Sequence, residues 1–194
     1  MNSHETLVRC PWVGSDPLEQ RYHDEEWGVP CHDEQAHFMY LLMESMSCGL
    51  SWRLMVVKRE IFRECFAGFD AGKVASFTDE DVRRILATPG MIRSEQKVRA
   101  IIHNAQCFVR VQQEYGSFDR YIWSFTDGKT MVYPEHQHEW ATRNELSDLV
   151  SRDLKKRGFK YVGSIIIYSH LQGIGIINDH RCECFRYREL LSLV

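Results

Sequence analysis

Apolar side chains recur at intervals of three and four residues along most of the chain, and this spacing constrains the fold more than any other feature. Each such stretch follows a residue type that commonly caps a helix N-terminus. These predicted caps are Asp33, Ser51, Thr78, Ser94 and Asn144. The expected helix ends lie near Gly49, Gly68 and Gly158. The sequence therefore predicts a mainly α fold.

Three segments depart from this pattern. Residues 1–30 are rich in Trp, Pro, Gly and His and show no helical period, so we expect a loop-rich segment there. Residues 162–177 are the most apolar stretch; three consecutive isoleucines would suit a strand, but the length favours a buried helix. Asp127-Gly128 predicts a small turn.

Composition narrows the class of protein. With 44% apolar and 26% charged residues, the 194-residue chain suits a single compact unit with two lobes. No run of about 18 or more apolar residues occurs, which argues against a membrane span, and we expect a cytoplasmic location. The seven cysteines form no pattern of close pairs. That favours free thiols and a metal site over disulfides.

A Pro-Gly turn joins two of the predicted helices. The helix after Thr78 runs into Pro89, which stops it, and Gly90, which permits a positive φ. The next helix begins near Ser94, so the segment is a helix-hairpin-helix candidate. Backbone amides of such a turn, with the N-terminus of the following helix, can bind a DNA phosphate. An ordinary corner between two helices is an equally weighted alternative.

Basic residues gather locally although the net charge is −3. Residues 83–110 contain six basic residues against one acidic residue, and residues 152–160 contain five against one. A local surplus of this kind suits a surface that faces phosphates. For either cluster alone, a solvated helix face is the more common explanation.

The two ends of the chain carry candidate metal ligands. Cys10 and His23 lie near the N-terminus, and His180 and Cys184 lie four residues apart near the C-terminus. Zn²⁺ favours thiolate and imidazole ligands in a tetrahedral site. The patterns of zinc deaminases and of zinc proteases with a His-Glu-x-x-His motif are absent from the sequence. From spacing alone, isolated packed or surface side chains remain an open alternative, and His136 in a polar loop is expected to be solvated.

Glu44 is a carboxylate within an apolar stretch of a predicted helix. A carboxylate among aromatic rings suits a flat cationic base, because the rings stack on the base and the carboxylate accepts its N–H groups. The candidate rings are those of Trp12, Tyr22, Trp27 and Trp52. The alternative is that Glu44 faces solvent and the tryptophans belong to the core.

Five segments together resemble the bacterial 3-methyladenine DNA glycosylase I family. They are Arg9–Trp12, Tyr22–Pro30, Glu44 with Gly49–Trp52, Lys155–Gly163 and Asn178–His180. The resemblance implies a helix-hairpin-helix DNA glycosylase fold with a zinc-binding lobe formed by both termini. The first lobe would span approximately residues 35–125, and the zinc-binding lobe approximately residues 1–34 plus 126–194.

The resemblance also implies functional residues. One structural zinc ion would be held by Cys10, His23, His180 and Cys184, and four protein ligands leave no open position for catalysis. Glu44 would be the catalytic carboxylate of the base pocket, and the base would be bound by Tyr22, Trp52, Trp12 and Trp27. DNA would be bound by Gly90, Met91, Arg93 and Lys97.

The activity implied is hydrolysis of the N-glycosidic bond of 3-methyladenine in alkylated double-stranded DNA, with the free base as product. The flipped base would leave readily because methylation at N3 makes it cationic. We expect a monomeric bacterial enzyme that does not bind membranes. Two alternatives stay open: a non-catalytic DNA-binding module, and a glycosylase for another lesion such as 3-methylguanine.

The chain departs from the family pattern at four places. Glu19 replaces a pocket tyrosine, and Glu95 occupies a usually basic position after the hairpin. Ser45–Cys48 lacks the usual Gln before Gly-Leu-Ser-Trp, and His170-Leu171 replaces a usual Phe-Met pair. None of these changes removes a predicted metal ligand or the pocket carboxylate.

Overall fold

The structure, a computed structural model, describes residues 7–137 and 141–192, and most of these residues are helical. The α-helices are α1 (Pro17–Glu25), α2 (Glu34–Ser47), α3 (Trp52–Cys65), α4 (Ala71–Ala75), α5 (Asp79–Ala87), α6 (Glu95–Tyr115), α7 (Phe118–Trp123), α8 (Glu145–Lys156), α9 (Ser164–Gly173) and α10 (Phe185–Leu191). Three short 3₁₀ segments are Ala67–Phe69, Ser124–Thr126 and Pro134–Gln137. The predicted mainly α fold is confirmed.

Capping side chains begin several helices where the sequence predicts them. At α3, the Ser51 hydroxyl accepts a hydrogen bond from the Leu54 amide at 3.3 Å. At α5, the Thr78 amide donates to the Asp81 carboxylate at 2.9 Å, which is half of a capping box. Asn144 at the start of α8 accepts from the Ser147 amide at 2.9 Å. These three predicted helix starts are confirmed. They can be predicted from sequence because capping depends on residues within three positions of each other.

The expectation of a loop-rich segment over residues 1–30 is wrong for α1. The Asp16 carboxylate accepts the Leu18 amide at 2.8 Å, and Pro17 occupies the first helical position. The helix is polar on most faces and buries only Tyr22 and His23, so it shows little hydrophobic period. In α8, the apolar side chain of Leu149 is 45% exposed.

The apolar stretch 162–177 contains both structures that its composition allows. Most of it is α9, which includes the three isoleucines, and its last residue begins strand β2 (Ile177–Asn178), which pairs in parallel with β1 (Met131–Val132). Gly175 separates the two with φ +76°. A Cβ atom on Gly175 would lie 2.4 Å from the Val29 carbonyl carbon, so only glycine allows this approach. The turn predicted at Asp127-Gly128 is present, with φ of 53° and 76°.

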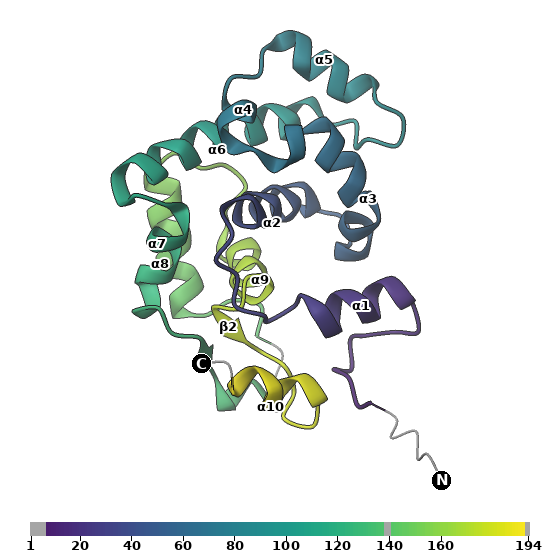
Figure 1. The fold of residues 1–194 in the computed structure, drawn as a ribbon, viewed down its shortest axis with the longest axis vertical. Coiled ribbons are helices and arrows are strands. Elements are labelled where there is room, and N and C mark those ends of the chain that lie inside the picture. Colours follow the sequence, from purple (N-terminus) through teal and green to yellow (C-terminus); the bar gives the residue numbers. More distant parts are fainter. Residues whose placement is uncertain (1–6, 138–140, 193–194) are drawn as a thin grey trace.

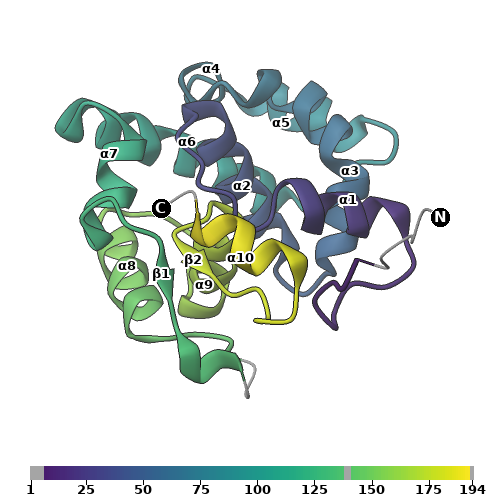
Figure 2. The ribbon, with the colours of Figure 1, turned by 60° about the horizontal axis from the view of Figure 1, so that its bottom comes forward.

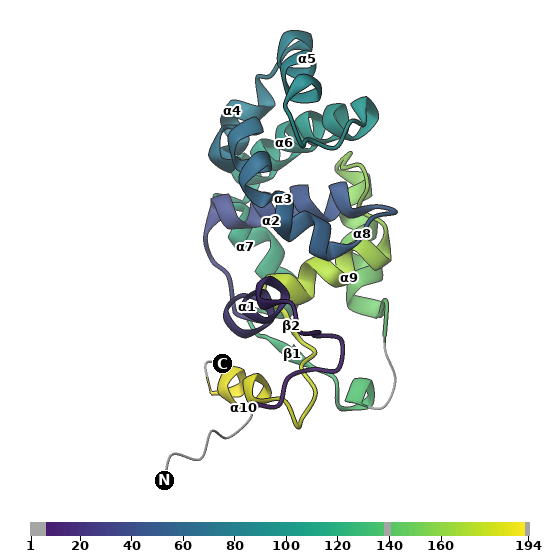
Figure 3. The ribbon, with the colours of Figure 1, turned by 90° about the vertical axis from the view of Figure 1, so that its right-hand side faces the viewer.

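Helix α2 runs through the middle of the molecule, between α6 on one side and α9 on the other (Figures 1 and 3). Its buried residues run without interruption from His37 to Met46. The last helix, α10, lies at the same end of the molecule as the segment that precedes α1 (Figure 2). The Phe185 amide donates to the Val8 carbonyl at 2.9 Å, which ties these two parts of the chain together. Within the described residues, no helix is long and apolar enough to cross a membrane.

His170 of α9 is completely buried against α2, and neither ring nitrogen has a hydrogen-bonding partner among the described residues. Burial, with a smaller contribution from His37, lowers the pKa of His170 from 6.5 to about 3. The His37 ring is itself bound to Asp119 at 3.1 Å. A histidine that is neutral when folded and protonated when unfolded destabilises the fold as the pH falls from 6.5 toward 3.

We therefore expect His170→Phe, which restores the residue type usual in the family, to increase acid stability. At pH 5 the buried neutral histidine costs about 2 kcal/mol that it does not cost above pH 6.5. Urea unfolding at pH 7.5 and pH 5 measures the effect, which should be larger at pH 5. An equal change at both pH values would show that His170 does not titrate during unfolding.

Candidate functional site

Four side chains from the two ends of the chain form one buried cluster. Cys10, His23, His180 and Cys184 are each at most 2% exposed, and their candidate ligand atoms all lie within 4.8 Å of one another. The Cys184 sulfur is 3.5 Å from His23 Nε2 and 3.5 Å from His180 Nδ1. The Cys10 sulfur is also 3.5 Å from His180 Nδ1. A tetrahedral metal with ordinary bond lengths places sulfur and nitrogen ligands about 3.5 Å apart, so the cluster fits one metal ion.

Neighbouring groups orient both imidazoles of this cluster. His23 Nδ1 donates to the Asp24 carboxylate at 2.8 Å, and Arg9 binds the same carboxylate at 2.7 Å. His180 Nε2 donates to the backbone oxygen of Trp27 at 2.9 Å. Each histidine therefore directs its remaining, unprotonated nitrogen toward the two sulfur atoms. Such outer partners are typical of histidines that bind metals.

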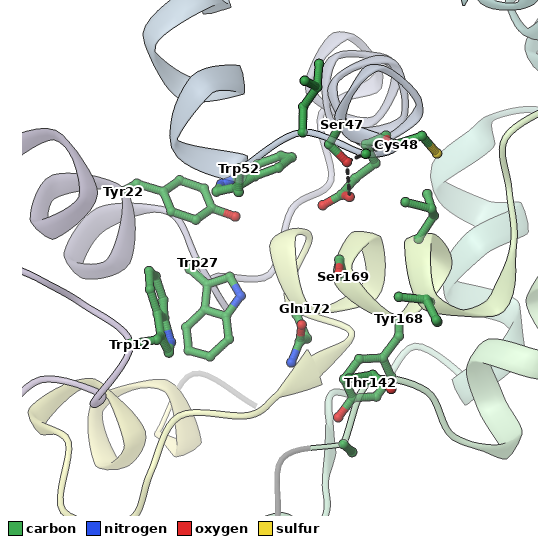
Figure 4. A pocket seen from close by; sticks show the side chains of 16 residues that line it. Trp12, Tyr22, Trp27, Ser47, Cys48, Trp52, Thr142, Tyr168, Ser169 and Gln172 are labelled. Atoms are coloured by element: carbon green, nitrogen blue, oxygen red, sulfur yellow. Dashed lines mark hydrogen bonds between the residues drawn. The ribbon is translucent and has the colours of Figure 1, made fainter.

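A cavity of about 440 Å³ lies beside the cluster (Figure 4). Its walls come from the segment before α1, from α1, from the α2–α3 connection, from α9 and from residues 141–142. The lining residues are Trp12, Tyr22, Trp27, Glu44, Ser47, Cys48, Gly49, Leu50, Trp52, Ala141, Thr142, Ile165, Ile166, Tyr168, Ser169 and Gln172. The predicted carboxylate and all four predicted aromatic rings thus meet at one cavity.

Glu44 lies on the last turn of α2 and is only 4% exposed. The Ser47 hydroxyl lies 3.5 Å from its carboxylate and 2.8 Å from its backbone oxygen. Burial raises the pKa of Glu44 to about 8, because the contact with Ser47 offsets little of the lost hydration. Among the residues that the structure describes, no cationic side chain forms an ion pair with Glu44, so a cation that enters the cavity would supply its first one.

The aromatic rings form two pairs around the cavity (Figure 4). The Tyr22 and Trp52 centroids are 5.4 Å apart, and those of Trp12 and Trp27 are 5.1 Å apart. Burial raises the pKa of Tyr22 well above its usual value, so its hydroxyl stays protonated. The indole N–H groups of Trp12 and Trp52 have no hydrogen-bonding partner among the described residues. The cavity therefore offers aromatic rings to a flat ligand, whereas these two N–H groups are buried.

The Cys/His cluster and the cavity share a wall. The Trp27 ring lies 4.5 Å from the His180 ring, edge to face, and the Trp12 ring lies 5.4 Å from the His23 ring. Both tryptophans line the cavity on their other side. The position of these two rings therefore depends on the cluster behind them.

The opposite wall, from α9, was not predicted from the sequence. Gln172 donates to the Asp179 carboxylate at 2.7 Å, and the Tyr168 hydroxyl donates to the same carboxylate at 2.6 Å. His136 joins this network at 3.0 Å from Asp179, with its side chain 12% exposed, so the expectation that it is solvated is wrong. His138, the other histidine of that loop, lies outside the described residues. The only sequence signal for this wall is the Asn178–His180 segment. The signal is indirect, because Asp179 does not line the cavity itself but binds Tyr168 and Gln172 of α9, which do.

The predicted DNA-binding residues lie at the turn between α5 and α6. Gly90 has φ +78°, and Arg93 is exposed. Met91 is 6% exposed, and its amide donates to the Thr88 oxygen at 3.1 Å, which does not favour direct contact with DNA. The ammonium group of Lys97 contacts backbone oxygens at the end of α2. A DNA contact by any of these residues stays a prediction.

Three of the departures from the family pattern can now be placed. Glu19 is not among the residues that line the cavity, so the carboxylate does not take the place of the missing tyrosine ring. Glu95 forms an ion pair with Arg99 at 2.7 Å, which offsets its charge near the hairpin. Ser47, from the segment that lacks the usual Gln, contacts Glu44.

Comparison with known proteins agrees with this arrangement. The family described as Methyladenine glycosylase matches residues 12–187. DNA-3-methyladenine glycosylase 1 of Escherichia coli (strain K12) is 42% identical over 182 residues, which cover 93% of this chain and 97% of that protein. A crystal structure of 3-methyladenine DNA glycosylase I is 41% identical with a TM-score of 0.86, covering 92% of this chain and 98% of that one.

A third relative adds information about a ligand. The Staphylococcus aureus 3-methyladenine DNA glycosylase I, described for its recognition of 3-methyladenine, is 34% identical. Its structure has a TM-score of 0.87 and covers 91% of this chain and 95% of that one. From the match over nearly its whole length, the chain belongs to the methyladenine glycosylase family.

Proposed function

We propose that this chain hydrolyses the N-glycosidic bond of 3-methyladenine in alkylated DNA and releases the free base. The observation that carries the proposal is the buried Glu44 carboxyl group at a cavity lined by four aromatic rings. The named relatives are 3-methyladenine glycosylases, and they align with nearly the whole chain.

The cavity suits a cationic purine that has been turned out of the duplex. Extruding a nucleotide costs unstacking energy, and a damaged base that pairs and stacks poorly costs less. Stacking on aromatic rings contributes about 1–3 kcal/mol per base. The rings of Tyr22, Trp52, Trp12 and Trp27 would hold the base, and the Glu44 carboxylate would accept its N–H groups.

The charge of Glu44 distinguishes the damaged base from normal adenine. While it is still bonded to the deoxyribose, N3-methylated adenine carries a positive charge, whereas unmodified adenine is neutral. Entry of the cation stabilises the ionised carboxylate, so the Glu44 proton leaves on binding. As the glycosidic bond breaks, the base becomes neutral and its attraction to Glu44 decreases. Glu44 thus acts mainly on the cationic base before its bond to the sugar breaks, by drawing it into the cavity and holding it where water can attack the sugar.

The raised pKa of Glu44 predicts a pH dependence of kcat/KM. This constant reports ionisations of the free enzyme, so it should rise with pH by about tenfold per unit below pH 8 and level off above it. Release of 3-methyladenine from one methylated duplex, measured between pH 5.5 and pH 9.5, tests the expectation. A profile with the same rise in Glu44→Gln would assign the ionisation to another group.

We propose that the metal of the buried cluster is one zinc ion with a structural role. Two thiolates and two imidazoles are a common zinc ligand set, and this set leaves no position for a reacting water. Cys10, His23, His180 and Cys184 would hold it. The ion would stabilise the junction of the two chain ends and support the rings of Trp12 and Trp27.

The DNA duplex would lie across the cavity mouth and the hairpin between α5 and α6. Gly90, Met91, Arg93 and Lys97 are the sequence-based candidates for its contacts, and exposed Arg93 is the one best placed to reach a phosphate. A bacterial cytoplasmic location, a monomeric state and the two-lobed division of the chain stay predictions.

Product analysis tests the function directly. Methylated genomic DNA incubated with the protein should release 3-methyladenine, and chromatography identifies the base. Release of 3-methylguanine as the main product would favour the other lesion as substrate. Binding of DNA without release of any base would favour the non-catalytic DNA-binding module.

A further inference from the structure

Lys97 lies on the first turn of α6, immediately after the hairpin. Its ammonium nitrogen donates to the backbone oxygen of Met46 at 2.8 Å and to that of Cys48 at 2.6 Å. The side chain is half-buried and directed into the protein. Arg93, four residues earlier, is exposed. Two basic residues of one segment therefore have different surroundings.

The two oxygens that Lys97 binds belong to the end of α2. The last carbonyl groups of a helix lack partners within the helix, and a cation there also offsets the helix dipole. Helix α2 has no basic residue in its own last turn. Beyond Cys48 the chain turns at Gly49 with φ +79°. Lys97, which is about 50 residues away in sequence, supplies the charge that this end lacks.

The end of α2 is also a wall of the cavity. Glu44 and Ser47 lie on its last turn, and Cys48 and Gly49 follow in the same wall. The contributions to the Glu44 pKa are burial and Ser47, with none from Lys97. Lys97 can therefore influence Glu44 only through the backbone at the end of α2. This backbone carries Glu44, and Lys97 binds two of its carbonyl oxygens.

We propose that Lys97 is a positioning residue that fastens the base-binding turn of α2 to the hairpin, and that it is not a phosphate ligand. A second lysine links the hairpin to the next helix along the chain after α2, since Lys58 of α3 donates to the Gly90 oxygen at the hairpin turn. Helix α2 contacts α6, which lies above it in the view of Figure 3. The proposal rests on the function proposed above, and it makes the hairpin a support of the base pocket.

Two measurements separate a positioning role from a phosphate contact. The first is affinity for free 3-methyladenine, followed by quenching of tryptophan fluorescence, because no phosphate is present in that assay. The second is the salt dependence of binding to an unmodified duplex oligonucleotide. Loss of one phosphate contact reduces the slope of log K against log salt by about 1.

Lys97→Met should weaken binding of free 3-methyladenine by about tenfold and lower kcat, because a displaced turn misplaces Glu44. The salt slope should stay at the wild-type value. Lys97→Arg, which keeps a cation but with another shape, should have intermediate affinity for the base and the same slope. Arg93→Ala should show the opposite behaviour, with its slope reduced by about 1. Lys129→Ala, an exposed lysine before β1, controls for loss of surface charge.

Wild-type affinity for the base in both Lys97 variants would overturn the proposal, and so would a slope reduced by about 1. If Lys97→Met does not fold, the affinity of Lys97→Arg for the free base decides alone, because a phosphate ligand would leave it unchanged. A wild-type protein that releases no 3-methyladenine counts against the proposed function. If the wild type releases 3-methyladenine normally and the Lys97 variants bind the free base with wild-type affinity, the result counts only against this inference.

Discussion

Glu44→Gln should decrease kcat/KM for release of 3-methyladenine by about 10²-fold and at the same time stabilise the folded protein. Activity falls because the neutral amide cannot attract the cationic base. Stability rises because the folded pKa of Glu44, about 8, lies above the unfolded value of 4.5. A carboxyl group of this kind destabilises the fold progressively as the pH rises from 4.5 to 8, by about 3 kcal/mol at pH 7.

Single-turnover release and urea unfolding at pH 6 and pH 8 measure the two effects, and the stabilisation should be larger at pH 8. Glu60→Gln is the matched control, because it makes the same chemical change on α3 at a side chain that is 78% exposed. That variant should keep wild-type activity and change stability by less than about 0.5 kcal/mol. Reduced stability of Glu44→Gln at pH 8, or undiminished activity, would contradict the assignment.

Cys184→Ser should remove one equivalent of zinc and lower the melting temperature by more than about 10 °C. Structural zinc contributes about 10–16 kcal/mol to small zinc domains. A loss of even about 4 kcal/mol corresponds to about 8–16 °C for a chain of this size. Because Trp27 packs on His180, binding of free 3-methyladenine should be lost as well.

Elemental analysis, scanning calorimetry and fluorescence quenching give the three readouts. Cys182→Ser, an exposed cysteine two residues away, should retain zinc and the wild-type melting temperature. A strong chelator added to wild type should reproduce the effects of Cys184→Ser. Wild-type protein that contains no zinc after expression in zinc-supplemented medium would refute the proposal.

The helix starts at Ser51, Thr78 and Asn144 could be predicted because capping is decided within three residues along the chain. Helix α1 could not, because its buried face consists of Tyr22 and His23, and such a face is too narrow to give a period. The predicted members of the cluster and of the aromatic walls do meet in space, and this was inferred from the family resemblance and not from spacing.

The contacts that connect these parts were beyond sequence reasoning. The sequence predicts Lys97 to be a phosphate ligand because it is basic and follows a hairpin. Its backbone carbonyl partners become visible only from the packing of α6 on α2. Likewise, Asp179 is adjacent to a metal ligand but binds Gln172 and Tyr168 on α9. Both depend on how helices distant in sequence lie against each other.

The shared wall of cluster and cavity has a consequence for protein synthesis. Cys10 and His180 are 170 residues apart, so a nascent chain that has emerged only as far as α8 carries two of the four side chains of the Cys/His cluster. Until α9 and the segment after it emerge, Trp27 lacks its contact with the His180 ring, and the cavity lacks a wall. An interrupted translation product would therefore lack both the complete cluster and the complete cavity.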